Sequence, residues 1–354
     1  MADAPQLHGL FIGNRSHLDG AGRYFGMIEG ELEKLGVRLH HVQPNSYRSA
    51  ASLLVRTIRR QGPPRIDFVL FNALGSVFFK TSIMIAWLSR LFRVPVFMYW
   101  REMGLSFALY TEKAPRKVQT ADRFARQPLL HHVANSNVCA SYIQQRYRIP
   151  QPVVIGNCAQ TLLPSNYMKL SSPGHPSVVC IGSIQNRKGT DLFIDTAIQA
   201  CQNHQTVEFI WIGHNGPRAE DRAKIDRANL QHRILFYGAM EKPGYLVAKA
   251  TVFFCSSREE SFSQATAEAM ALGKSIVTFE SGGPPEILAG TGTVIPNFDT
   301  KLAAQKLLEL INAPTLTGHN AAAQQIYEQL YTPQKHAAAL NAHLRSCLST
   351  QRIS

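Results

Sequence analysis

The chain is poor in the features that mark secreted, metal-binding or nucleotide-hydrolysing proteins. It has only six cysteines in 354 residues and no CxxC pair, which is typical of buried thiols in a reducing compartment and argues against a disulfide framework or a zinc site. Its histidines lack metal-ligand spacings such as HExxH, so we interpret them as structural. A GKS/T phosphate loop, a GxSxG elbow and paired metal carboxylates are also missing.

Long apolar runs are missing too. The first six residues lack the basic start of a secretory signal, and the longest apolar region, residues 77–100, is interrupted by three basic residues and Pro95. A membrane-spanning helix needs about 20 mostly apolar residues. We therefore predict a cytoplasmic protein in which residues 77–100 form a buried helix and a strand.

Acidic residues are few compared with basic ones, 24 against 37, and the net charge is +13. The imbalance is concentrated in residues 1–150, which hold 20 basic and 9 acidic side chains. Such a surface suits an anionic membrane, an acidic polymer or a nucleic acid, although charge runs are more often solvated faces. No motif of a known nucleic-acid module appears, so we predict no nucleic-acid partner.

Strand-length apolar runs alternate with helical segments along the chain, which predicts an α/β fold with two Rossmann-like, doubly wound parallel sheets. The predicted strands are residues 8–13, 37–42, 66–71, 94–100, 130–134, 177–182, 207–212, 234–237, 251–255 and 275–279. The predicted helices are residues 23–35, 49–60, 77–92, 138–147, 190–201, 245–249, 261–272, 300–311, 320–331 and 333–348.

Periodicity fades between residues 157 and 176, where three prolines and several serines mark a domain boundary. We predict a first domain at residues 1–160, a linker at 161–176 and a second domain at 177–332. The C-terminal helix, about residues 333–354, is expected to pack back on the first domain.

The most informative stretch is residues 258–288, which reads as a loop, helix and strand that follow a buried strand. Glu260 and Glu268 stand eight positions apart, about 12 Å along a helix, and residues 261–263 are predicted to open that helix. Helix-start amides bind phosphate groups, whereas two carboxylates suit the hydroxyls of a sugar or a ribose. The alternative is that Glu260 is a first-turn acid stabilised by the helix dipole and Glu268 a solvated helix residue.

Other polar groups follow predicted strands, at the sheet edge where open α/β folds bind ligands. Arg187 and Lys188 lie in the turn 183–189, and two such cations suit a diphosphate, although they equally suit an exposed loop. Arg101 and Glu102 occupy a similar position in the first half.

The run from Gly20 to Gly26 also follows a strand, but its loop and spacing differ from the dinucleotide fingerprint, which argues against a dehydrogenase. Its glycines would let backbone approach a sugar or phosphate, or would simply allow positive φ in a loop.

In this order, these pieces resemble the retaining, two-domain glycosyltransferases of the GT-B fold, specifically the family 4 group. Four fragments over about 110 residues carry the resemblance: Cys180-Ile181-Gly182 with Lys188-Gly189, Phe209 to Gly213, Phe236-Tyr237-Gly238, and Ser257 through Glu286. The first half matches in outline through Gly20 to Gly22, Trp100-Arg101-Glu102 and Val133 to Ser136.

The resemblance implies two domains that face a cleft. It implies sugar transfer, with retention, from a nucleotide-diphosphate sugar to a lipid-linked or saccharide acceptor, without a metal or other cofactor. Within this sequence it implies that Glu268 binds the ribose, Glu260 contacts the transferred sugar and Lys188 neutralises the departing diphosphate. Arg187, Arg101 and Glu102 complete the predicted catalytic group. The other predicted donor-binding residues are Ser261, Phe262, Ser263, Gly182, Ser183, Gly213, Met240, Gly20 and Gly22.

Two positions depart from the family pattern. The family usually has Arg directly after the glycine, where this chain has Ser183, and the nearby Arg187 is a candidate replacement. The first-domain strand usually ends in His before an acid, where this chain has Arg101. These changes leave open an altered donor preference or lost activity. One alternative is therefore a non-catalytic nucleotide-sugar-binding protein. A separate alternative is a nucleotide-sugar epimerase or hydrolase on the same fold. The basic first half adds a predicted peripheral contact with the inner face of an anionic membrane.

Overall fold

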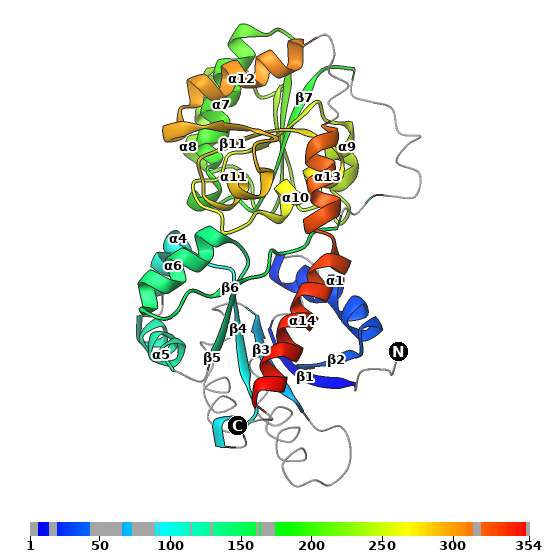
Figure 1. The fold of residues 1–354 in the computed structure, drawn as a ribbon. Helices are drawn as coiled ribbons and strands as arrows, with labels where there is room; N and C mark the ends of the chain where they lie inside the picture. Colours follow the sequence, from blue (N-terminus) through cyan, green and yellow to red (C-terminus); the bar gives the residue numbers. More distant parts are fainter. Residues whose placement is uncertain are drawn as a thin grey trace. The chain divides into compact units, whose positions relative to one another are not determined.

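A computed structural model of the chain (Figure 1) describes residues 6–13, 20–42, 66–72, 89–91, 93–113, 115–127, 130–160, 163, 174–313 and 320–351. The chain divides into two compact units. The first comprises Met1–Cys158 and Thr332–Ser354, and the second comprises Ala159–Tyr331. The predicted loop 14–19, the helix 49–60, most of the helix 77–92 and most of the linker 161–176 lie outside the described residues.

The first unit is built on a six-stranded parallel sheet with the order β2-β1-β3-β4-β5-β6. Leu10 of β1 pairs with His40 on one side and Val69 on the other. Because the chain changes direction across the sheet between β1 and β3, a topological switch point lies between these strands. The strands are β1 (Leu7–Ile12), β2 (Val37–Val42), β3 (Phe68–Asn72), β4 (Val96–Trp100), β5 (Leu130–Ala134) and β6 (Val153–Val154).

Helices cover both faces of this sheet. One layer contains α1 (Gly20–Lys34) and α14 (Pro333–Gln351), and the other contains α4 (Gly104–Lys113), α5 (Pro115–Ala125) and α6 (Asn137–Tyr147). Successive strand residues point to opposite faces, so Leu10 and Ile12 pack with the α4–α6 layer while Phe11 packs with α1 and α14. This arrangement explains why β1, β3 and β4 are almost continuously apolar.

The C-terminal helix α14 is tied to the first unit by His336, which is fully buried. One ring nitrogen, Nδ1, lies 2.7 Å from the carbonyl of Gly156, and the other, Nε2, lies 2.7 Å from the Tyr24 hydroxyl. Burial lowers the pKa of His336 to about 4. The neutral ring therefore donates from Nδ1 to the carbonyl and accepts the Tyr24 hydroxyl at Nε2.

The second unit repeats the design with the parallel order β12-β11-β10-β7-β8-β9. Its switch point lies between β7 and β10, because the chain runs from β7 outward through β8 and β9 and then returns to the other side of β7. The strands are β7 (Ser177–Ile181), β8 (Glu208–Ile212), β9 (Ile234–Tyr237), β10 (Val252–Cys255), β11 (Ser275–Phe279) and β12 (Thr293–Ile295).

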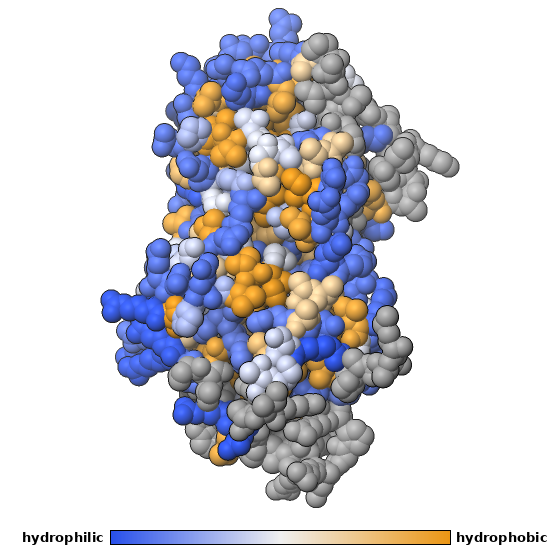
Figure 2. Space-filling view, in the orientation of Figure 1, coloured by the Kyte–Doolittle hydropathy of each residue, from blue (hydrophilic) through white to orange (hydrophobic). Residues whose placement is uncertain are grey.

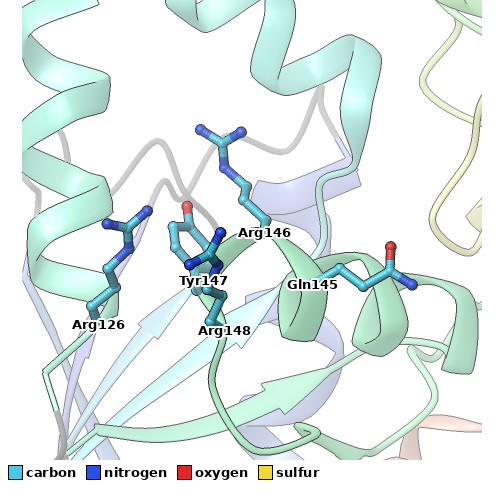
Figure 3. Close-up of a pocket in the computed structure, with 5 residues that line it drawn as sticks. All are labelled: Arg126, Gln145, Arg146, Tyr147 and Arg148. Carbon is cyan, nitrogen blue, oxygen red and sulfur yellow. The ribbon is translucent and has the colours of Figure 1, made fainter.

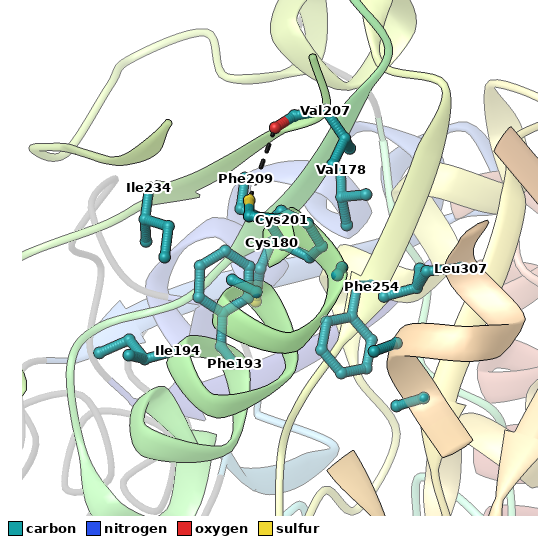
Figure 4. Close-up of a cluster of buried hydrophobic side chains, with 14 of the residues drawn as sticks. Val178, Cys180, Phe193, Ile194, Cys201, Val207, Phe209, Ile234, Phe254 and Leu307 are labelled. Atoms are coloured by element: carbon teal, nitrogen blue, oxygen red, sulfur yellow. Dashed lines mark hydrogen bonds between the residues drawn. The ribbon is translucent and has the colours of Figure 1, made fainter. Parts of the chain in front are cut away.

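One face of this sheet packs against α7 (Thr190–Asn203), α8 (Ala219–Arg227) and α12 (Thr300–Asn312). Figure 4 shows Phe193 of α7 among side chains of the strands and α12. Its ring meets Phe209 and Trp211 edge to face, at centroid distances of 5.7 and 5.2 Å. The other face carries α9 (Gly244–Lys249), α10 (Gln264–Ala271), α11 (Gly283–Leu288) and α13 (Ala321–Leu330).

The predicted α/β class with two doubly wound parallel sheets is confirmed, and every predicted strand is present with its ends shifted by at most two residues. Four helices, α4, α5, α8 and α11, and the short strands β6 and β12 were not predicted. The reason is clearest for α8, where only Asp221 and Ile225 are buried, so the segment has no apolar stripe to mark its period. None of the helices in the described residues is long and apolar enough to cross a membrane.

Candidate functional site

The polar residues of the second unit gather at the carboxyl ends of β7, β10 and β11, around the switch point. The loop after β7 carries Arg187 and Lys188 in a 3-10 turn. The loop after β10 carries Glu260, whose backbone forms a parallel bridge with Gly282 in the loop after β11. Three loops that are distant in sequence therefore meet where ligands bind in open α/β sheets.

Glu260 is the centre of this cluster, and only 6% of its surface is exposed. Its Oε1 accepts a short hydrogen bond from the Lys188 ammonium and another, 2.9 Å long, from the Ser257 hydroxyl. Its Oε2 accepts from Arg187 at 3.0 Å, and the same guanidinium nitrogen donates to the Glu259 carbonyl at 2.9 Å. We call Arg187, Lys188 and Glu260 the switch-point triad.

The electrostatics of the triad favour the charged forms of Glu260 and Arg187. Burial alone would raise the pKa of Glu260, but the charges of Lys188 and Arg187 outweigh burial and hold that pKa well below its usual range. Glu260 in turn raises the pKa of Arg187. The triad therefore carries a net charge of about +1 at neutral pH, inside a largely desolvated setting where charges interact more strongly than in water.

Close backbone contacts hold the triad loops in place. Gly189 ends the 3-10 turn at φ 65°, and a Cβ there would stand 2.0 Å from the Ser256 carbonyl oxygen. The Ser256 hydroxyl donates to the Lys188 carbonyl at 3.1 Å. Arg258 forms a two-pronged ion pair with Asp191 in the first turn of α7. The position of the cations thus depends on backbone that only glycine fits.

The predicted start of the helix that follows Glu260 was wrong. α10 begins at Gln264, and Ser263 is its N-cap, with its hydroxyl accepting from the Thr266 amide at 3.3 Å. Ser261 and Phe262 precede the helix, and the Phe262 side chain is 1% exposed and packs edge to face with Tyr331. The helix-start amides are therefore those of Gln264 to Thr266, and the Phe262 side chain belongs to the core.

The structure also contradicts the alternative interpretation of Glu260 and Glu268 as ordinary helix residues. Glu260 is not a first-turn acid, because it lies before the helix in the bridge to Gly282. Glu268 is not solvated, because it lies in α10 with 4% of its surface exposed. A buried carboxylate needs partners, so both positions are structurally specified.

The other predicted donor-binding residues of this unit lie on neighbouring loops. Gly182 and Ser183 directly follow β7, and Gly213 directly follows β8. The two loops are so close that a Cβ on Gly213 would stand 1.9 Å from the carbonyl oxygen of Gly182. Met240 lies in the loop after β9, partly buried against the core. All of these positions border the carboxyl edge of the sheet, although β9 is its far strand.

In the first unit, Arg101 and Glu102 directly follow β4. The Arg101 guanidinium donates to the Asn72 side chain at the end of β3 (3.2 Å) and lies 4.7 Å from the centre of the Tyr24 ring. The Arg101 amide donates to Glu102 Oε2 at 3.2 Å. Arg101 is thus held at the carboxyl edge of the first sheet by an amide and a ring.

The prediction for the glycines of the first unit was partly wrong. Gly20 and Gly22 lie in the first turn of α1, which begins three residues before its predicted start, rather than in the preceding loop. They remain near the end of β1, since only residues 13–19 separate β1 from α1.

Sequence reasoning missed Ser257 and Asn72, which hold Glu260 and Arg101 in place. The sequence did contain a signal for both residues, because each is polar and lies at or just after the end of a buried strand, where ligand-binding residues gather. Within the described ranges, no group of three His, Cys, Asp or Glu side chains could hold a metal ion. All six cysteines are free thiols.

Comparison with known proteins places these features in context. Residues 175–313, most of the second unit, match the family described as glycosyl transferases group 1. The second unit is therefore similar to this glycosyltransferase family over most of its length. A lipopolysaccharide core biosynthesis mannosyltransferase, LpcC of Rhizobium leguminosarum bv. viciae, is 28% identical over 190 residues, which is 51% of this chain and 53% of that protein. The chain spans about half or less of the length of the curated relatives it matches.

Two solved glycosyltransferase-type structures share the fold of nearly the whole chain. Sucrose-phosphate synthase from Thermosynechococcus elongatus has a TM-score of 0.75 at 15% identity, over 98% of this chain and 100% of that chain. HepE from Anabaena, in complex with UDP-glucose, has a TM-score of 0.72 at 18% identity, with the same coverage. At these identities the likeness concerns the fold alone, and it confirms two Rossmann-like units of the GT-B type.

Proposed function

We propose that this chain is a retaining glycosyltransferase of the family 4 type, which moves a sugar from a nucleotide-diphosphate sugar to a lipid-linked or saccharide acceptor. The observation that carries the proposal is the switch-point triad, in which a buried carboxylate holds two cations at the carboxyl edge of the second sheet. The match of residues 175–313 to glycosyl transferases group 1 and the mannosyltransferase relative support it.

Lys188 and Arg187 bind the donor diphosphate in this proposal. When the bond between the sugar and the diphosphate breaks, negative charge grows on the leaving phosphate oxygen, and cations fixed in advance stabilise that charge without reorganising. Lys188 and Arg187 would supply two such cations, and we therefore propose a metal-independent reaction. The acceptor hydroxyl then attacks the face from which the diphosphate departs, and a donor phosphate oxygen takes its proton.

Glu260 has room for one more donor, which assigns it a second role. A carboxylate offers about four lone-pair positions, and three are used: Lys188 and Ser257 on Oε1, and Arg187 on Oε2. A hydroxyl of the transferred sugar would take the remaining position on Oε2. Glu260 would thus orient the sugar and the leaving-group cations from one place.

Glu268 and Met240 complete the donor site in the proposal. Glu268 lies on α10, eight residues after Glu260, and its carboxylate would accept the ribose hydroxyls. Met240 borders the carboxyl edge at β9 and would contact the base. Glu268→Ala should weaken UDP and GDP binding, and an unaltered dissociation constant for both nucleotides would remove the ribose role.

The first unit would bind the acceptor. Its basic residues include Lys113, Arg116, Arg123 and Arg126, all exposed on or beside α4 and α5. Figure 2 shows strongly hydrophilic side chains over this part of the first unit. We propose that this face contacts anionic lipid on the cytoplasmic side of a membrane. Co-sedimentation that shows no preference for anionic over neutral liposomes would contradict the membrane contact.

The reaction itself is tested by screening UDP-, GDP- and ADP-sugars for a thermal shift and following nucleotide release from the best donor. Release only after an acceptor is added identifies a transferase, whereas release without acceptor identifies a hydrolase. Lys188→Ala should lower turnover by about 10²-fold or more. Lys242→Ala, which removes an exposed cation of the same unit, should leave the rate unchanged. An equal rate in wild type and Lys188→Ala would refute the proposed role.

A further inference from the structure

Three successive backbone carbonyls in the turn that carries the triad cations are hydrogen-bonded to the loop after β10. The Asn186 carbonyl accepts from the Arg258 guanidinium at 3.0 Å. The Arg187 carbonyl accepts from the Arg258 amide at 2.8 Å. The Lys188 carbonyl accepts from the Ser256 hydroxyl at 3.1 Å. The loop after β10 therefore holds the backbone from which both cations of the switch-point triad extend.

The side chain of Arg258 joins this turn to the helix that follows it. The guanidinium nitrogen that donates to the Asn186 carbonyl also donates to Asp191 Oδ1 at 2.7 Å, and the second terminal nitrogen donates to Oδ2. Asp191 lies in the first turn of α7. A planar guanidinium matches a carboxylate with two parallel bonds, a geometry that an ammonium group does not reproduce. Arg258 thus ties the turn and the start of α7 to its own loop.

The charge of Arg258 has its own partner, separate from the triad. The hydrogen bond from Arg258 lowers the pKa of Asp191, and the same bond raises the pKa of Arg258. Glu260 instead pairs with Arg187 and Lys188. Because Asp191 balances the charge of Arg258, this arginine is poorly suited to act on a diphosphate as a third cation. Its contacts suit it to hold the turn in place.

We propose that Arg258 is a positioning residue, which fixes the turn so that Arg187 and Lys188 meet the departing diphosphate without moving. The role in turnover rests on the proposed function, whereas the fixed turn does not. Cations that are fixed in advance stabilise developing charge because nothing reorganises during the reaction. A displacement of about 1 Å can lower a rate by about 10²-fold. Ser256 and Gly189 still hold the turn when Arg258 is lost, so the effect is smaller than that.

Steady-state kinetics of the full chain measure the role, with the nucleotide sugar that gives the largest thermal shift as donor. Arg258→Gln should lower kcat about tenfold. The donor KM and the dissociation constant of UDP or GDP, whichever matches the donor, should change by less than about threefold, because mobile cations still reach a bound diphosphate. A purely structural role would leave kcat unchanged well below the thermal midpoint, since a partly exposed ion pair contributes too little to unfold the chain.

Asp191→Asn distinguishes positioning from a direct effect of charge, because the two predict opposite signs. If Arg258 acted on the diphosphate through its charge, removal of the neighbouring carboxylate would strengthen nucleotide binding and raise kcat. If Arg258 acts through position, it loses its anchor and kcat should fall by about threefold to tenfold. Arg258→Lys keeps the charge without the two-pronged geometry, so its kcat should lie between those of wild type and Arg258→Gln.

Two other ion pairs provide matched controls. Lys224 of α8 pairs with Asp195 on α7, the helix that Arg258 also contacts. In the first unit, Arg146 pairs with Asp122 at 3.0 and 3.2 Å, and its side chain is 26% exposed, as is that of Arg258. Figure 3 shows Arg146 among the side chains that line a cavity of that unit. Lys224→Gln and Arg146→Gln should lower the thermal midpoint by a few degrees, as Arg258→Gln does, and leave kcat within about twofold of wild type.

Hydrogen exchange tests the position of the turn without any reaction. The Gly189 amide closes the turn by donating to the Asn186 carbonyl at 3.0 Å, and the Arg258 amide donates to the Arg187 carbonyl. Backbone amides exchange when such bonds open locally. Peptides that cover residues 185–190 and 256–260 should therefore exchange faster in Arg258→Gln than in wild type or in Lys224→Gln.

The possible results separate the positioning role from the proposed reaction. Unchanged exchange in Arg258→Gln overturns the positioning role, whether or not the chain transfers sugar. An active wild type whose kcat is retained in Arg258→Gln, or raised in Asp191→Asn, overturns it as well. If the wild type releases nucleotide without an acceptor, or releases none, the proposed transferase function fails, and the exchange result still decides whether Arg258 fixes the turn.

Discussion

Replacing Glu260 by Gln separates binding of the donor diphosphate from the chemistry that follows. The substitution keeps the shape of the side chain and one acceptor oxygen but removes the charge that Lys188 and Arg187 share. Breaking a buried ion pair costs about 3–5 kcal/mol. Since Lys188 and Arg187 side chains are 18% and 27% exposed, water offsets part of the loss, and we expect the free energy of unfolding to fall by about 2–3 kcal/mol.

The effect on ligands should run in opposite directions for binding and turnover. Without the carboxylate the triad charge rises from about +1 to about +2, so UDP should bind as tightly as in the wild type, or more tightly. Turnover should fall by about 10²-fold, because the cations lose their fixed positions and the sugar loses its acceptor. Glu259→Gln, which removes a neighbouring carboxylate outside the triad, is the matched control.

Isothermal titration with UDP and steady-state kinetics measure the two quantities on one preparation. If Glu260→Gln weakens UDP binding as much as Lys188→Ala, Glu260 contacts the nucleotide itself and the positioning role is wrong. The dependence of the free energy of unfolding on pH, measured in acid, gives a second check. The folded pKa of Glu260 is depressed, so its contribution is present above about pH 4.5 and is lost as the pH falls toward 2. Glu260→Gln should lack that part of the pH dependence.

Three other perturbations test the packing around the sites. Lys274 is 7% exposed and donates at 2.8 Å to the carbonyls of Ala248 and Ala250, so Lys274→Met should lower the free energy of unfolding by about 2 kcal/mol in urea titrations. The pKa of His336 is lowered to about 4, so stability should decline as the pH falls from 6.5 to 4, by up to about 3 kcal/mol; an identical pH profile in His336→Gln would refute this. Gly189→Ala forces a Cβ to within 2.0 Å of a carbonyl oxygen at positive φ, and we expect about 2 kcal/mol or more of lost stability by thermal or chemical unfolding; a loss below 0.5 kcal/mol would show that the turn relaxes.

Local patterns were sufficient to predict the sheets, because parallel strands covered on both faces must be apolar throughout. Phe68 to Phe71 and Val252 to Cys255 are examples, each fully buried and free of polar residues. Short polar helices were not predictable in the same way, since α8 is held by few buried residues and shows no apolar period.

The start of α10 shows how a tertiary contact overrides a local signal. Ser261 and Ser263 are both good N-caps, so sequence alone cannot choose between them. The bridge from Glu260 to Gly282 keeps the chain extended at this point, and Gly283 approaches Phe262 too closely for a side chain. The helix therefore begins only after Ser263, whose φ of 74° lets the chain turn. The pairing partners come from a loop about 20 residues later, which no local pattern reports.

The triad itself was predicted as a set of ligand-binding residues but not as a set of mutual partners. Lys188 and Glu260 are 72 residues apart, and only the adjacency of β7 and β10 in the sheet brings them together. Sequence reasoning assigned each residue to a part of a donor molecule. The structure shows that the two cations and the carboxylate bind one another.

In the proposed reaction, this mutual binding would let Arg187 take the place of the arginine that the resembled family usually has where this chain has Ser183. Position 183 lies just after the end of β7. Arg187 lies further along the same loop, in a 3-10 turn, and its side chain contacts Glu260 in the loop after β10. Its guanidinium is fixed by Glu260 and by the Glu259 carbonyl. Both leaving-group cations of the proposed reaction therefore depend on one carboxylate for their position. In the proposed reaction Glu260 therefore positions both cations, and we expect the charge of Glu260, rather than its size, to control turnover.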